Sequence, residues 1–144
     1  MSGYSGTPLP QKLGLKDGMK VGFANLPAPL TELAGAREFA GVDRVQEWDD
    51  LAGGYNYIHL FIDKAATARA AIPAMPDKIM PDGMVWVSWP KKASNVPTDM
   101  SEDVIRNTAL EGILVDTKVC AVDDIWSGLK LVVRKEHRAS MKMP

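Results

Sequence analysis

The sequence has few of the residues from which several common sites are built. Its 144 residues include one cysteine, Cys120, which excludes an internal disulfide. Cys120 lies in an apolar run, where a thiol is typically a small buried hydrophobic group. The two histidines, His59 and His137, have no spacing to other ligands that predicts a zinc site or a nucleophilic triad. We therefore expect no metal, and we expect His59 to be a hydrogen-bonded core residue.

The sequence also lacks an excess of charge and a long apolar segment. Lysine and arginine number 17 against 18 acidic residues, so the net charge of -1 provides no overall field to attract nucleic acid or an anionic membrane. No run of roughly 18 apolar residues occurs, and the amino terminus has no stretch that resembles a signal peptide. We expect one cytoplasmic globular domain without a nucleic-acid or membrane partner.

Strand-like and helix-like segments alternate along the chain. Alternating or continuous apolar runs predict strands over 19–25, 42–48, 55–62, 84–89, 118–125 and 129–134. Apolar residues at helical spacing predict a helix after the first strand. Helices are also predicted over 64–72 and from an N-cap at Ser101. Trp126-Ser127-Gly128 is suited to a tight hairpin turn.

This order predicts an α/β fold, specifically a small three-layer Rossmann-like sheet that is mostly parallel, with the first strand central. The hairpin adds one antiparallel strand at the carboxyl end. We divide the chain into an N-terminal arm (1–18), a single Rossmann-like domain (19–134) and a basic tail (135–144).

The segment WPKKASNVPT leaves the fourth predicted strand at the edge where open α/β sheets bind ligands. Its lysines and hydroxyls could hold a phosphate or carboxylate, and a tryptophan beside them suits stacking. The alternative is that the lysines only solvate a loop. The candidate ligand-binding residues are Trp89, Lys91, Lys92, Ser94 and Thr98.

The amino-terminal arm is a second candidate, because it places two hydroxyls and two glycines within a few residues. Ser5 and Thr7 could fold over the sheet edge and contact the same ligand. Thr7 could also cap a short helix beginning at Pro8. The two interpretations are compatible.

Two further groups favour structural roles. Asp123 and Asp124 are adjacent in sequence, so in a strand their carboxylates point to opposite faces and do not share a metal. One of them is expected to hydrogen-bond the turn backbone. Trp48, Trp89 and Trp126 lie near strand ends or turns, where they could form a stacking pocket or a contact between copies in a homo-oligomer.

Three segments, GYSGTPL, WPKKAS and VDTKVCAVDDIWSGL, resemble a family of short bacterial proteins classed as a domain of unknown function. That resemblance implies no activity.

The Pro81-Asp82-Gly83 entry into a strand and the closing hairpin resemble class I S-adenosylmethionine-dependent methyltransferases. In that family a glycine-rich turn follows the first strand and an acidic residue ends the second. Here Glu47 could take the acidic position, but the turn is Asn25-Leu26-Pro27, without glycine.

The sequence favours a non-catalytic module that binds a small anionic or nucleotide-type ligand at the edge formed by residues 89–98. One alternative is a divergent methyltransferase-like transferase using the same edge. A second is a protein-interaction or self-association module anchored by tryptophans. No particular cofactor is indicated.

Overall fold

The computed structural model describes residues 7–141, which form one mixed α/β sheet structure. The sheet has six strands in the order β2-β1-β3-β4-β6-β5. β1 to β4 are parallel, and β6 runs antiparallel to both β4 and β5. The strands are β1 (Lys20–Ala24), β2 (Gly41–Val45), β3 (Tyr55–Phe61), β4 (Ile79–Pro90), β5 (Leu114–Ala121) and β6 (Trp126–Val133). The mostly parallel Rossmann-like sheet with an antiparallel C-terminal hairpin is confirmed.

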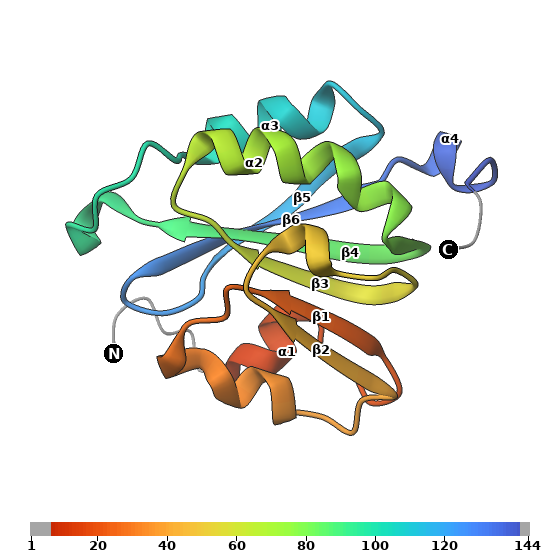
Figure 1. Cartoon of the computed structure of the whole chain (residues 1–144), viewed down its shortest axis with the longest axis horizontal. Coiled ribbons are helices and arrows are strands. Elements are labelled where there is room, and N and C mark those ends of the chain that lie inside the picture. The colour runs from red at the N-terminus through yellow and green to blue at the C-terminus, as the bar shows by residue number, and fades with distance from the viewer. Residues whose placement is uncertain (1–6, 142–144) are drawn as a thin grey trace.

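Helices cover both faces of the sheet. The α-helices are α1 (Leu9–Leu13), α2 (Ala65–Ala71), α3 (Glu102–Leu110) and α4 (Lys135–Arg138). The 3-10 helices are η1 (Ala28–Gly35), η2 (Trp48–Asp50), η3 (Ile72–Asp77) and η4 (Lys92–Ser94). Figure 1 shows α2 and α3 together on one face and α1 on the other. No helix among the described residues is long and apolar enough to cross a membrane.

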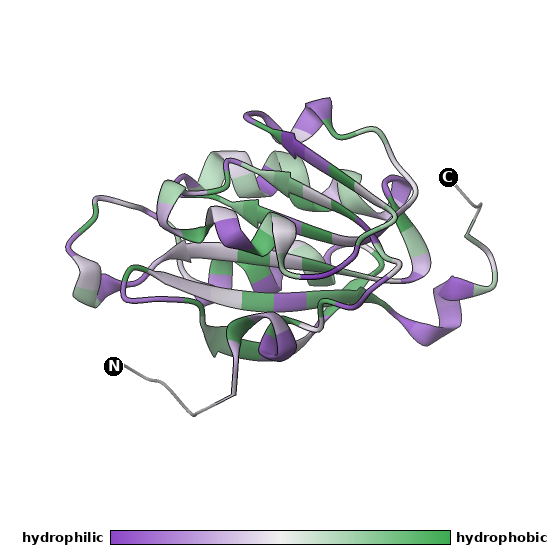
Figure 2. Ribbon diagram, turned by 90° about the horizontal axis from the view of Figure 1, so that it is seen from below, coloured by the Kyte–Doolittle hydropathy of each residue, from purple (hydrophilic) through white to green (hydrophobic). Residues whose placement is uncertain are grey.

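The core consists of two apolar layers, one on each face of the sheet. Alternation along β4 sends Val85 and Val87 toward one layer and Trp86 toward the other. Leu13 and Leu15, which belong to the expected N-terminal arm, pack in the same layer as Trp86. The Trp86 indole also donates a 2.8 Å hydrogen bond to the Leu13 carbonyl. By contrast, α4 lies apart from the sheet and carries hydrophilic residues (Figure 2).

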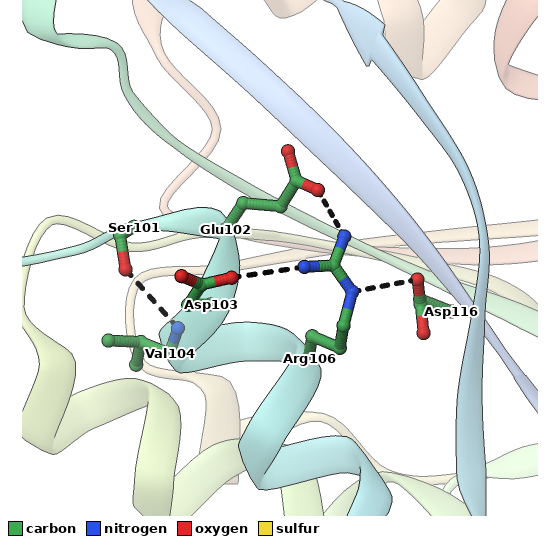
Figure 3. A network of polar contacts seen from close by, with 6 residues as sticks. All are labelled: Ser101, Glu102, Asp103, Val104, Arg106 and Asp116. Atoms are coloured by element: carbon green, nitrogen blue, oxygen red, sulfur yellow. Dashed lines mark hydrogen bonds and ion pairs between the residues drawn. The ribbon is translucent and has the colours of Figure 1, made fainter.

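The α3 helix begins as the sequence predicts. Ser101 is the N-cap, and its Oγ accepts a 3.2 Å hydrogen bond from the Val104 amide. Arg106 then contacts Glu102 and Asp103 on its own helix and donates a 3.0 Å hydrogen bond to Asp116 on β5 (Figure 3). The cap fixes where α3 starts, and the arginine joins it to the edge of the sheet.

Several local predictions are wrong. β1 is not central, because β2 lies outside it and leaves it one strand from the edge. A helix does follow β1, as expected, but it is the 3-10 helix η1 and it ends at Gly35, a residue type that disfavours helix continuation. The expected Thr7 cap is not formed, since α1 has Pro8 at its N-cap and no side-chain cap bond. The chain reverses at residues 122–125 instead of at Trp126-Ser127-Gly128, which begins β6.

The position of the hairpin turn has a clear cause. Asp123 Oδ1 accepts hydrogen bonds from the amides of Ile125 (2.9 Å) and Trp126 (2.7 Å), which closes the turn. Gly128 instead lies within β6 where space is short, because a Cβ there would lie 3.0 Å from Ser88 Oγ. The glycine therefore serves close packing, and the expected role of one aspartate in the turn is confirmed.

Candidate functional site

A cavity of about 230 Å³ lies beyond the carboxyl ends of three adjacent strands, β2, β1 and β3. The chain leaves β1 through η1, which packs on one face of the sheet, and leaves β3 through α2, which packs on the other. In open α/β sheets this reversal of direction opens the crevice where ligands bind. The lining residues are Ala24, Asn25, Gln46, Glu47, Trp48, Leu60, Phe61, Ile62, Asp63, Lys64 and Thr67.

Asn25 lines this cavity and joins the three strand ends. Its φ of 59° is left-handed, a conformation that glycine usually supplies and that asparagine tolerates better than most residues. Its amide donates a 2.9 Å hydrogen bond to the Val45 carbonyl of β2. Its side-chain Nδ2 donates a 3.3 Å bond to the Phe61 carbonyl of β3. Asn25 therefore makes a sharp turn directly after β1 and ties this turn to β2 and β3.

Three charged side chains line the cavity and remain available to a ligand. Glu47 follows β2, and Asp63 and Lys64 follow β3. All three are exposed, and within residues 7–141 none of these side chains forms a hydrogen bond or ion pair with another residue. Trp48, half-buried beside Glu47, adds a flat apolar wall. The cavity thus offers an acidic group and an aromatic surface at one end, and a carboxylate with an ammonium at the other.

The segment chosen from the sequence does not line this cavity. Trp89 is only 8% exposed and packs in the core, so it does not offer a stacking face at a loop mouth. Ser94 Oγ donates to the Lys91 carbonyl (2.6 Å), and Thr98 Oγ1 donates to the Asp63 carbonyl (2.5 Å). No residue of this segment lines the cavity. A role for Trp89, Lys91, Lys92, Ser94 and Thr98 in ligand binding stays a prediction.

The other residues singled out in the sequence lie outside the cavity lining or outside the described residues. Thr7 is half-buried just before α1, and Ser5 lies outside the described residues. Trp126 is half-buried and packs edge-on against Phe61, with ring centroids 5.3 Å apart. Cys120 is half-buried, and burial raises the pKa of its thiol. Within the described part of the chain no group of three or more metal-ligating side chains occurs.

His59 is a core residue, as expected. It is fully buried, and its ring nitrogens form hydrogen bonds of 2.8 Å with the Tyr57 hydroxyl and 2.6 Å with the Ser88 hydroxyl. Phe61 stacks on the ring at 4.2 Å between centroids. Burial lowers the pKa of His59 to about 3, so the ring is neutral at physiological pH. His59 therefore forms hydrogen bonds with neighbouring side chains inside the sheet and does not line the cavity.

No protein-family model matches the sequence, and no curated protein matches it. Solved structures do. The magnesium protoporphyrin IX methyltransferase ChlM from Synechocystis PCC 6803, with bound S-adenosylmethionine, aligns with 16% identity and a TM-score of 0.64 over 88% of this chain and 74% of ChlM. The pyocyanin biosynthetic protein PhzM aligns with 11% identity and a TM-score of 0.65 over 88% of this chain and 53% of PhzM.

A third similar structure is an S-adenosylmethionine-dependent methyltransferase from Bacteroides fragilis, in complex with S-adenosylhomocysteine. It has 8% identity and a TM-score of 0.59 over 91% of this chain and 79% of that protein. This chain has a Rossmann-like methyltransferase fold. The architectural resemblance noted in the sequence is confirmed, whereas the resemblance to the family of unknown function is supported by no family model.

The main functional expectation, a non-catalytic module for a small anionic ligand, is wrong. The similar structures include S-adenosylmethionine-dependent methyltransferases, and they favour the methyltransferase-like alternative. The sequence did contain an indication of where the cavity lies, namely polar residues that follow parallel strands. Asn25, Glu47 and Asp63 each come directly after, or within two residues of, a parallel strand. Strand order, which the sequence does not state, is what brings them together.

Proposed function

We propose that this protein is a methyltransferase-like transferase that binds S-adenosylmethionine in the cavity beyond β1, β2 and β3. The observation that carries the proposal is the position of Glu47, just beyond β2 and 22 residues after Asn25. In dinucleotide-binding folds, an acidic residue about 20 residues after the turn that follows the first strand contacts the ribose. Glu47 has that spacing, and its exposed carboxylate lines the cavity.

The residues around the cavity fit this cofactor in three respects. In the proposal, Glu47 accepts hydrogen bonds from the ribose hydroxyls, and Trp48 with Ile62 provides apolar walls for the adenine. Asn25 gives the left-handed turn that lets the chain pass close beneath the ligand. When bound, S-adenosylmethionine supplies an electrophilic methyl group carried on a sulfonium.

The test is calorimetric titration of the protein with S-adenosylhomocysteine and S-adenosylmethionine. We expect saturable binding that Glu47→Ala weakens about tenfold or more, because the variant loses a charge-assisted hydrogen bond to the ribose. Glu111→Ala removes an exposed carboxylate at the end of α3, away from the cavity, and is the matched control. Absence of binding to the wild-type protein, or equal affinity in Glu47→Ala, would contradict the proposal.

A further inference from the structure

The turn after β1 offers few donors for the amino-acid end of the cofactor. Pro27 and Pro29 have no N–H group. The Asn25 amide is already bonded to the Val45 carbonyl, and the Leu30 amide donates to the Pro27 carbonyl at 2.9 Å. The η1 helix that follows also has no side-chain cap. Among the described residues only the Leu26 and Ala28 amides of this turn have no backbone acceptor, so a carboxylate placed here would meet few backbone donors.

The turn after β3 has the opposite character, with a fixed backbone and free charged side chains. Thr98 Oγ1 donates to the Asp63 carbonyl (2.5 Å), and the Lys64 carbonyl accepts from the Thr67 and Ala68 amides at 3.1 and 3.2 Å. Both charged side chains line the cavity, and neither forms an ion pair within residues 7–141. The turn is thus preorganised, and its carboxylate and ammonium are available to a ligand.

The distance between Glu47 and the Asp63–Lys64 pair, and the charges of these three side chains, suit the two ends of the cofactor. β1 lies between β2 and β3, so the ends that carry Glu47 and Asp63 are two strand spacings apart, roughly 10 Å. That span is comparable to the reach of the homocysteine chain from the ribose. Glu47, Asp63 and Lys64 together carry a net negative charge, whereas the sulfonium, ammonium and carboxylate of S-adenosylmethionine carry a net positive one.

We infer that the amino-acid end of the cofactor is held from the β3–α2 turn, with Lys64 on its carboxylate and Asp63 on its ammonium group. This inference rests on the proposed function. It assigns recognition of the charged end to side chains of the β3–α2 turn, in place of the backbone of the turn after β1. Asp63 and Lys64 then determine the preference for an amino-acid-bearing nucleoside over the bare nucleoside.

The experiment compares S-adenosylhomocysteine with 5′-methylthioadenosine, which keeps the nucleoside and the thioether but lacks the amino-acid chain. Affinities are measured by calorimetry for the wild-type protein, Lys64→Ala and Asp63→Asn, with Lys135→Ala on α4 as the control. We expect each cavity variant to bind S-adenosylhomocysteine about tenfold more weakly and 5′-methylthioadenosine within about twofold of wild type. Lys135→Ala should leave both affinities unchanged.

Equal weakening of both ligands, or no weakening of either, would overturn the inference while leaving the proposed function intact. Failure of the wild-type protein to bind either ligand would overturn both. A circular dichroism melt of each variant shows whether the fold is retained. The ratio of the two affinities within one variant is independent of the fraction of folded protein.

Discussion

His59 shows how one buried side chain couples the fold to pH. Its ring is fully buried between aromatic neighbours and bonded through both nitrogens to Tyr57 and Ser88. Desolvation lowers its pKa from 6.5 to about 3 in the folded protein. The unfolded chain therefore binds a proton at a higher pH than the folded chain does. The associated stability is present above pH 6.5 and is lost as the pH falls from 6.5 toward 3.

We therefore expect the free energy of unfolding to fall by roughly 2 kcal/mol between pH 7 and pH 5 from this group alone. Urea unfolding at the two pH values measures the change. His59→Gln removes the titrating group and should reduce the difference between the two pH values. Identical pH dependence in wild type and His59→Gln would show that His59 is not the source.

At the level of elements, α3 is fixed at its start by a cap and along its length by Arg106. The hydrogen bonds to Glu102 and Asp116 raise the pKa of Arg106, so the guanidinium stays charged. Asp116 belongs to β5, an edge strand, and its contact with Arg106 ties that strand to α3. These groups are partly exposed, so the cap is expected to contribute more to stability than the ion pairs.

Ser101→Ala should lower the free energy of unfolding by about 1 kcal/mol, because the Val104 amide loses its acceptor. Thermal or urea unfolding at neutral pH checks this value. Ser140→Ala is the control, since Ser140 Oγ bonds the His137 carbonyl near the carboxyl end and should matter less. A loss in Ser101→Ala no larger than in Ser140→Ala would show that the cap does not stabilise α3.

For the molecule as a whole, the sequence predicted the succession of strands along the chain and the Rossmann-like class, because apolar runs and their turns are local signals. It placed the hairpin turn wrongly, since Gly128 is needed for packing against Ser88 and not for a turn. It also favoured Lys91 and Lys92, which are adjacent in sequence. The cavity instead combines residues from three turns, and only the pairing of β1 with β2 and β3 brings them together.

The most direct test of the account is a ¹H–¹⁵N nuclear magnetic resonance titration with S-adenosylhomocysteine. The four tryptophan indole signals report on distinct places, because Trp48 lines the cavity whereas Trp86 and Trp89 are buried in the core. We expect the Trp48 indole signal and the amides of Asn25, Glu47 and Asp63 to shift together and to saturate, because these residues line the cavity. Shifts concentrated at residues 89–98, or no shifts at all, would contradict this expectation.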